Sequence, residues 1–322
     1  MIKTDTKISV VIPTYNSSLT IVNTIESIVN SLKNDFEIII VDDCSSDNTV
    51  NIIKNLELNN TIKIINLNEN SGPGVARDEG LKQAKGEYTI FFDSDDLMLP
   101  DAIDNALTIL DDKDIDIAIF PYKINFMNGT TIDMWDRDRY IIEQIITNVG
   151  HYPTIENNQE LLTITNYPWN KICKTSFLLD HNIRFGNLRL HEDIIPHWLI
   201  LMNSREIYLA KDNICEYMLS STGNNVTNDS GEKRLLSVSA CKELFNIMNS
   251  NEKYSKFINM YWIFSANLLT WARDMIDEKY KKKVINLSYE LFQNIKFLNL
   301  IQIYKIDNNA FNSIHFFLIE RN

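Results

Sequence analysis

The segment YTIFFDSDDLMLP (Tyr88–Pro100) begins as an apolar run and then carries three aspartates within four residues. Its first part, rich in aromatic and β-branched residues, is typical of a buried strand. Asp93, Asp95 and Asp96 follow at the point where such a strand ends. Three interpretations of these carboxylates are open: a solvated turn, the start of a helix predicted from Pro100 to Leu110, or ligands for a divalent cation.

Similar apolar runs recur through the first 120 residues, with helical patterns between them. The runs are ISVVI (8–12), EIIIV (37–41), IKIIN (62–66) and DIAIF (116–120). Apolar residues at helical spacing predict a helix over LTIVNTIESIVNSLK (19–33), and weaker helical signals cover 49–56 and 75–84, the latter interrupted by Gly80. Strands that alternate with helices predict an α/β fold, in which helices flank a Rossmann-like, mostly parallel sheet.

Polar and turn-forming residues follow these strands at the ends where open α/β sheets bind ligands. The segments are Pro13-Thr14-Tyr15-Asn16, Asp42-Asp43-Cys44-Ser45, NSGPGVARDEG (70–80) and Asp93-Ser94-Asp95-Asp96. Because the carboxyl ends of parallel strands meet at one edge of a sheet, we expect these loops to form one composite cleft.

The alternation of strands and helices ends near residue 121. Residues 234–316 have the pattern of amphipathic helices, and the polar stretch SSTGNNVTNDSGEK (220–233) before them is typical of a boundary or a mobile loop. We therefore predict a first domain at 1–220, whose character changes near residue 120, and a C-terminal helical region at 221–322.

The composition excludes some classes of protein. The 43 acidic residues exceed the 31 Lys and Arg residues, and the net charge of −12 argues against nucleic acid as a partner. The four cysteines are far apart, as in reduced cytosolic proteins. Polar residues interrupt the longest apolar region (258–272), and the start has no signal-peptide pattern. We expect a cytoplasmic protein; peripheral association with the inner face of the cytoplasmic membrane, and a homodimer, stay open.

Two further segments carry candidate chemistry. In the loop that contains Gly72 and Gly74, the glycines let another group approach the backbone closely, and the Arg77 guanidinium carries a positive charge. The loop therefore either borders a phosphate or has glycines only because its backbone conformation requires them. The segment HEDIIPHW (191–198) lacks the HExxH spacing of a zinc protease. Its Glu192 and Asp193 are either a general base for a hydroxyl group or an acidic pair at a helix start.

Trp169 and Asn170 also have two interpretations. An aromatic ring beside an amide is a surface on which a sugar can stack, whereas a tryptophan of a globular domain is at least as often part of the core. The sequons at Asn225 and Asn228 have no expected meaning without a secretion signal.

Taken in order, these segments resemble the family 2 glycosyltransferases with the GT-A fold, especially bacterial polysaccharide and lipooligosaccharide enzymes. The matching segments span roughly residues 7–200 and are ISVVIPTYN, FEIIIVDDCSSDNT, LNENSGPGVARDEGLKQAKGEYTIFFDSDD, WNKICKTSFL and IRFGNLRLHEDI. The resemblance implies an inverting, metal-dependent hexosyl- or N-acetylhexosaminyltransferase. Its expected donor is a UDP-sugar, and its expected acceptor is a hydroxyl of a growing surface glycan or a lipid-linked acceptor.

The resemblance implies that 1–220 is a GT-A catalytic domain, with 1–120 as its nucleotide-sugar-binding half and 121–220 as its acceptor half. It also implies roles for individual residues on the donor side. Asp93 would face the ribose or the metal, and Asp95 would bind the Mn²⁺ or Mg²⁺ that bridges the diphosphate. Asp42 would support its turn, and the loop from Gly72 to Arg77 would border the nucleotide. The residues expected around the nucleotide are Pro13, Thr14, Tyr15, Asp43 and Ser94.

On the acceptor side, the resemblance implies that Asp193 is the catalytic base with Glu192 beside it. Trp169, Asn170 and His191 are the acceptor-binding candidates.

The chain departs from the family pattern in places. Asp78 stands where the family usually has Asn, which suggests a differently tuned nucleotide-side loop, and YMLSSTGNNVT (217–227) lacks an expected Arg. The Q-x-x-R-W signature of processive synthases is absent, which favours transfer of one sugar. Two other functions remain: a sugar-nucleotide pyrophosphorylase, although PTYNSS replaces its GxGTRL loop, and a non-catalytic nucleotide- or glycan-binding subunit.

Overall fold

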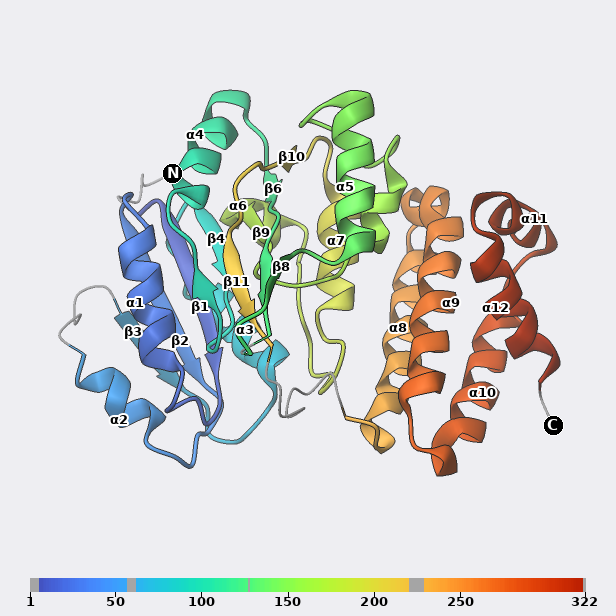
Figure 1. Cartoon of the computed structure of the whole chain (residues 1–322), viewed down its shortest axis with the longest axis horizontal. Coiled ribbons are helices and arrows are strands. Elements are labelled where there is room, and N and C mark those ends of the chain that lie inside the picture. Colours follow the sequence, from blue (N-terminus) through green and yellow to red (C-terminus); the bar gives the residue numbers. More distant parts are fainter. Residues whose placement is uncertain (1–5, 57–61, 127, 220–228, 321–322) are drawn as a thin grey trace.

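A computed structural model describes residues 6–56, 62–126, 128–219 and 229–320. Figure 1 shows a sheet surrounded by helices and, beside it, a group of helices that ends at the C-terminus. The predicted class, a mostly parallel sheet with flanking helices and further helices at the C-terminal end, is confirmed.

A seven-stranded sheet forms the centre of the α/β part, in the order β10-β6-β9-β4-β1-β2-β3. β9 runs antiparallel to both its neighbours, β4 and β6, whereas the other pairs are parallel. All five strands predicted from the apolar runs are present. The strands are β1 (Ile8–Thr14), β2 (Phe36–Asp42), β3 (Ile62–Asn66), β4 (Tyr88–Phe91), β6 (Ile117–Ile119), β9 (Lys171–Lys174) and β10 (Tyr208–Leu209).

Four helices accompany the first part of the sheet: α1 (Ile21–Ser31), α2 (Thr49–Lys54), α3 (Pro73–Leu81) and α4 (Ala102–Lys113). Packing explains why the helical signal of α3 is weak. α3 lies on β1, and a Cβ on Gly80 would come within 2.3 Å of Val11 Cγ1. Glycine at this position lowers helix propensity but lets the helix approach the sheet closely.

A second, four-stranded sheet stands next to the aspartate turn, in the order β5-β11-β7-β8. β5 directly follows the aspartates and pairs antiparallel with β11, so a segment more than 100 residues later returns to the turn. The strands are β5 (Leu97–Met98), β7 (Lys123–Asn125), β8 (Thr131–Asp133) and β11 (Cys215–Met218). The helices of this region are α5 (Asp136–Val149), η1 (Gln159–Thr163), α6 (Thr175–Asp180) and α7 (Ile194–Asn203).

From residue 232 the described chain is helical, and these helices continue the core of the α/β part. α7 packs on α8, and η1 packs on α9. The elements are η3 (Glu232–Leu235), α8 (Leu236–Ser250), η4 (Glu252–Phe257), α9 (Ile258–Met275), α10 (Glu278–Phe292), α11 (Phe297–Ile306) and α12 (Asn308–Ile319). A search of the described ranges finds no helix with the length and apolar character needed to cross a membrane. Residues 220–228, with the sequons at Asn225 and Asn228, lie outside the described residues.

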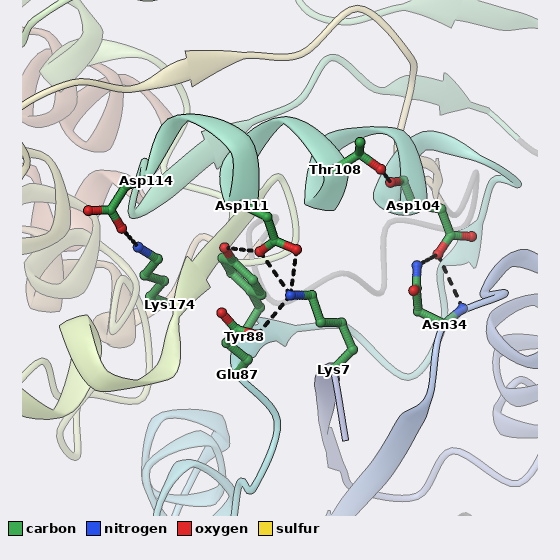
Figure 2. Close-up of polar contacts among 9 residues, drawn as sticks. All are labelled: Lys7, Asn34, Glu87, Tyr88, Asp104, Thr108, Asp111, Asp114 and Lys174. Carbon is green, nitrogen blue, oxygen red and sulfur yellow. Dashed lines mark hydrogen bonds and ion pairs between the residues drawn. The ribbon is translucent and has the colours of Figure 1, made fainter. Parts of the chain in front are cut away.

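Figure 2 shows polar contacts that attach α4 to the sheet edge opposite the carboxyl ends of the parallel strands. Lys7, just before β1, forms an ion pair with Asp111 of α4 at 2.6 Å, and Asp111 also accepts a hydrogen bond from the Tyr88 hydroxyl at 2.9 Å. Lys174, at the end of the antiparallel β9, pairs with Asp114 at 2.5 Å. These contacts belong to the scaffold, because they lie at the edge away from the predicted cleft.

Candidate active site

Hydroxyl groups from α1 and the residues before it hold the aspartate turn after β4. Ser17 Oγ lies 2.8 Å from Ser94 Oγ, and the Thr20 hydroxyl donates to the Ser94 carbonyl at 2.8 Å. The Thr24 hydroxyl donates to the Asp96 carbonyl at 2.9 Å. Thr20 and Thr24 are one helical turn apart and therefore share a face. This polar face of α1 fixes the backbone of the turn.

The aspartates of the turn have separate roles. Asp96 is buried and accepts a hydrogen bond from the N–H of Met218 in β11 at 2.8 Å, so it braces the turn from within. The residue Asp95 is exposed, although its carboxylate is partly enclosed by protein. Desolvation of this carboxylate, and then the negative charge of Asp93, raise the pKa of Asp95 to about 6.

Arg77 joins the aspartate turn to a second acidic pair. Its Nη2 donates to Asp93 Oδ1 at 2.6 Å, and its Nη1 donates to Glu192 Oε1 at 2.8 Å. Arg77 is 4% exposed, and its Cζ lies 5.2 Å from the ring centroid of Phe185. Burial lowers the pKa of Arg77, but the charges of Asp93 and Glu192 outweigh it and raise the pKa. Both terminal nitrogens of Arg77, which were predicted to face a phosphate, thus donate to carboxylates of the protein and are not free to bind a nucleotide.

The chain turns sharply before Glu192 and Asp193. His191 has a φ of 63°, which is uncommon for a residue other than glycine, and α7 begins directly after Asp193. Burial, and then the charge of Glu192, raise the pKa of Asp193 to about 7, while Arg77 and Lys171 act in the opposite direction. A carboxylate with a pKa near neutrality is suited to accept a proton from a hydroxyl group.

Gly74 and Asp78 of α3 position the loop that leads to this acidic pair. A Cβ on Gly74 would lie 2.5 Å from the Gly186 carbonyl oxygen and 3.2 Å from Glu192 Cβ. Asp78 accepts hydrogen bonds from the N–H groups of Phe185 at 2.9 Å and Gly186 at 3.0 Å. The close approach predicted at Gly74 is therefore to the protein's own loop. Asp78, where the chain departs from the family pattern, holds the same loop.

The loops after β2 and β3 are joined by the two adjacent aspartates at the end of β2. Asp42 Oδ2 accepts a hydrogen bond from the Ser45 N–H at 2.9 Å, within the turn that follows β2. Asp43 accepts from the N–H groups of Ser71 at 2.6 Å and Gly72 at 2.7 Å. Asp43 thus fixes the glycine loop beside the cleft.

The segment at the end of β1 offers one accessible side chain. Tyr15 is 50% exposed, whereas Pro13 and Thr14 are buried within the strand, which extends two residues beyond the predicted run. Their burial excludes side-chain contact between these two residues and a ligand in this structure, which corrects that part of the prediction. Both residues instead support the position of Tyr15.

The donor set of the aspartate turn suits a divalent cation. Asp93 and Asp95 supply hard carboxylate oxygens. Desolvation, and then the like charge of Asp93, raise the pKa of Asp95, and a bound cation would offset both effects. Within the described ranges, no three or more His, Cys, Asp or Glu side chains gather in a metal-binding arrangement. One or two carboxylates are nevertheless what Mg²⁺ needs when water and substrate phosphates supply its other ligands.

The acceptor-side prediction is wrong for Trp169 and Asn170. Trp169 is 0% exposed, and the ring of Tyr167 stacks on it at a centroid distance of 4.4 Å. Asn170 is 1% exposed and accepts a hydrogen bond from Lys171. A ring without accessible surface is no platform for a sugar, so these residues form the core beneath the cleft. The partly exposed rings of the cluster are Tyr167 and Tyr217.

His191 lies against the C-terminal helices. Its ring meets that of Trp271 in α9 edge-on, at a centroid distance of 6.1 Å, and Trp271 is 38% exposed. Arg234 Cζ lies 4.3 Å from the Trp271 ring centroid. Burial, and then the charge of Arg234, lower the pKa of His191 to about 4, so this imidazole is neutral at pH 7. Sequence reasoning missed Trp271 and Arg234 because they lie in helical patterns without a motif.

Arg189 is a second residue that sequence reasoning missed. It donates hydrogen bonds to both the side chain and the carbonyl of Asn70, and its Cδ would lie 3.2 Å from a Cβ on Gly72. Arg189 is exposed and thus places a cation beside the glycine loop. The available signal was an arginine two residues before His191, inside a segment already singled out.

Known proteins similar to this chain are bacterial glycosyltransferases. The chain is 35% identical over 219 residues to the glycosyltransferase TuaG of Bacillus subtilis, which is provisionally assigned to teichuronic acid biosynthesis; the match covers 66% of this chain and 79% of TuaG. It is 27% identical over 270 residues to the poly(ribitol-phosphate) beta-N-acetylglucosaminyltransferase TarS of Staphylococcus aureus, covering 80% of this chain and 45% of TarS. The chain therefore spans about half the length of TarS.

Solved structures show the same GT-A fold. S. aureus TarS 1–349 in complex with UDP-GlcNAc matches with a TM-score of 0.71 and 21% identity, over 97% of this chain and 90% of that one. The mannosyltransferase PcManGT from Pyrobaculum calidifontis, in complex with GDP-Man and Mn²⁺, matches with a TM-score of 0.52 and 14% identity, over 99% and 89%. The family model named glycosyl transferase family 2 matches residues 9–177. The chain belongs to glycosyltransferase family 2, as its motifs predict.

Proposed function

We propose that the chain transfers a single hexose or N-acetylhexosamine from a UDP-sugar to a hydroxyl of a growing surface glycan or a lipid-linked acceptor, with inversion. The observation that carries this proposal is the ion-pair bridge of Arg77, which contacts Asp93 at 2.6 Å and Glu192 at 2.8 Å. This bridge brings a donor-side carboxylate and the acidic pair together. The N-acetylglucosaminyl group in the name of TarS supports the same proposal.

On the donor side, Asp93 and Asp95 would hold Mn²⁺ or Mg²⁺, and Tyr15 would flank the nucleoside. Asp43 is buried with both carboxylate oxygens bonded to the glycine loop, so it would act through that loop rather than face the nucleoside as predicted. When bound, the cation would neutralise the charge that develops on the departing UDP. The backbone of the glycine loop, fixed by Asp43, would border the diphosphate. The protein's own contribution here is a rigid turn that needs little rearrangement when the donor arrives.

On the acceptor side, Asp193 would take the proton of the attacking hydroxyl. The acceptor oxygen forms a bond to the anomeric carbon while the bond from that carbon to UDP breaks, so one displacement inverts the carbon without an enzyme nucleophile. A positioned base typically contributes about 10²–10⁴-fold to the rate. The pKa of Asp193, about 7, supports this role near neutral pH. His191 and Trp271 border the side from which the acceptor would approach.

Two variants test this proposal. Asp193→Asn should bind UDP normally but lose about 10²–10⁴-fold in transfer, because an amide cannot take the proton. Asp95→Ala should lose Mn²⁺-dependent UDP binding, because one of two carboxylate ligands is gone. Calorimetry measures UDP affinity with and without Mn²⁺, and UDP release is measured with UDP-, GDP-, CMP- and dTDP-sugars.

The two variants fail in different ways. Near-wild-type turnover of Asp193→Asn would remove Asp193 as the base. An unchanged Mn²⁺-dependent affinity in Asp95→Ala would remove Asp95 as a metal ligand.

A further inference from the structure

Lys171 is a buried cation on the core side of the site. It is 4% exposed in β9, and its Nζ donates to the Tyr167 carbonyl at 2.6 Å and to the side-chain oxygen of Asn170. Both acceptors are neutral, and Lys171 forms no salt bridge shorter than 4.0 Å with a described residue. An ammonium group has three donors, and buried lysines are rare without a compensating negative charge. Its third donor and its charge therefore point to a further partner.

A cavity of about 10 Å³ joins Lys171 to the proposed base. Its polar lining includes Lys171, Asp193, His197 and Thr89. This volume suits one water molecule, and a buried water needs two to four polar partners. His197 is 2% exposed, and its ring lies near the backbone of Leu161 and Leu162, although neither ring nitrogen makes a well-formed hydrogen bond to a described residue. Such a buried polar group is costly unless a water satisfies it.

The charges around this cavity favour an interaction between Lys171 and Asp193. Burial lowers the pKa of Lys171 to about 8, so its ammonium is still charged at pH 7. Burial also lowers the pKa of His197 well below its ordinary value, so the imidazole is neutral. The groups that face Asp193 are Glu192, Arg77 and Lys171, and those that face Lys171 are Cys173, Asp193, Asp138 and His197.

We propose that Lys171 is a positioning residue for the base: through a water shared with His197, its charge holds the Asp193 carboxylate in place in its negative form. This inference rests on the proposed function, in which Asp193 accepts the proton. Lys171 itself touches no substrate. Lys171 acts on Asp193 across the cavity that β9 and the start of α7 line together.

The test is the pH profile of Lys171→Gln, which keeps a hydrogen-bonding side chain but removes the charge. UDP release from UDP-GlcNAc with Mn²⁺ should fall below about pH 7 in the wild type, where Asp193 takes up a proton. Loss of a nearby positive charge raises the pKa of a carboxyl. The acidic limb of the profile, where the rate falls with decreasing pH, should therefore lie about one pH unit higher in the variant. The rate should then be about tenfold lower near pH 6 and close to wild type near pH 9.

Lys174→Gln is the matched control, because Lys174 lies in the same strand but pairs with Asp114 and Asp116 at the scaffold edge. Its pH profile should superimpose on that of the wild type. An unmoved acidic limb in Lys171→Gln, or an equal loss of rate at every pH, overturns the inference. If Asp193→Asn retains turnover, the proposed base itself fails; if it is inactive and the limb stays unmoved, only the role of Lys171 fails.

A crystal structure of the wild-type protein tests the inference independently of how the variant folds. Electron density should show a water within hydrogen-bond distance of both Lys171 Nζ and the Asp193 carboxylate. A dry cavity with the two groups apart would overturn the shared-water arrangement.

Discussion

Single residues set how closely the aspartate turn and the acidic pair approach one another. Arg77 reaches Asp93 and Glu192 at once. Three residues earlier, Gly74 leaves the room that Glu192 and the Gly186 carbonyl occupy. Arg77 and Gly74 lie on the same short helix, α3, so one helix carries both the bridge and the space that the bridge requires.

At this scale we predict that Gly74→Ala lowers turnover at least tenfold while UDP affinity stays nearly unchanged. The new Cβ would lie 2.5 Å from the Gly186 carbonyl oxygen, so the loop before Asp193 must move, and small misplacements of catalytic groups are costly. UDP release and calorimetry measure the two quantities. Gly80→Ala on the same helix clashes with Val11 in the core instead, and should lower the melting temperature with less effect on turnover per folded molecule. Wild-type turnover in Gly74→Ala would contradict this account.

The helices α1 and α4 use polar residues to contact opposite edges of the sheet. The apolar face of α1 buries Ile21, Ile25 and Ile28, while Thr20 and Thr24 bind the aspartate turn. α4 performs a scaffold function at the opposite edge, where Asp111 receives both Lys7 and the Tyr88 hydroxyl (Figure 2). The edge that α4 contacts thus belongs to the scaffold, whereas the opposite edge carries the proposed site.

For α4 we predict that Lys7→Met lowers stability without lowering activity. The variant loses ion pairs to Glu87 at 2.7 Å and Asp111 at 2.6 Å. These acidic partners are partly solvated, so we expect a loss of about 1 kcal/mol, or about 2–4 °C in melting temperature. Differential scanning fluorimetry and UDP release per folded molecule check the two halves of the prediction. If Lys7→Met folds fully but releases UDP more slowly, this edge of the sheet affects the proposed site.

At the scale of the whole molecule, the C-terminal helices lie beside the proposed site. α9 brings Trp271 to His191, two residues before the proposed base, and α7, which begins at that base, packs on α8. Figure 1 shows α8 and α9 as the helices of this group next to α7. The catalytic part and the helical group are thus joined next to the chemistry.

We therefore predict that Trp271→Ala reduces UDP release from UDP-GlcNAc several-fold while UDP affinity is retained. The variant removes the ring against which His191 packs, so the segment that carries Asp193 loses a fixed neighbour. Met275→Ala is the control, because Met275 lies one turn further along α9 and is similarly exposed at 41%. Equal rates in both variants and the wild type would show that this contact does not position the base.

Local features of the sequence determined the strands, the fold class and the position of the aspartate turn. Buried strands need continuous apolar runs, and the residues at their carboxyl ends share one edge of the sheet. The motifs in their order also predicted the family. Asp42 and Asp96 brace the turns that directly follow their strands, and for Asp42 the family resemblance implied this role.

Tertiary structure decided which groups meet across long stretches of chain. Arg77 and Glu192 are 115 residues apart, so no local pattern could reveal that the guanidinium predicted to face a phosphate is bound to a carboxylate. Trp169 lost its predicted role because Tyr167 covers its ring, and burial depends on neighbours rather than on residue type. The cavity beside Lys171 and Asp193 exists because β9 and the start of α7 line it together, and Trp271 meets His191 because α9 lies against the segment before α7.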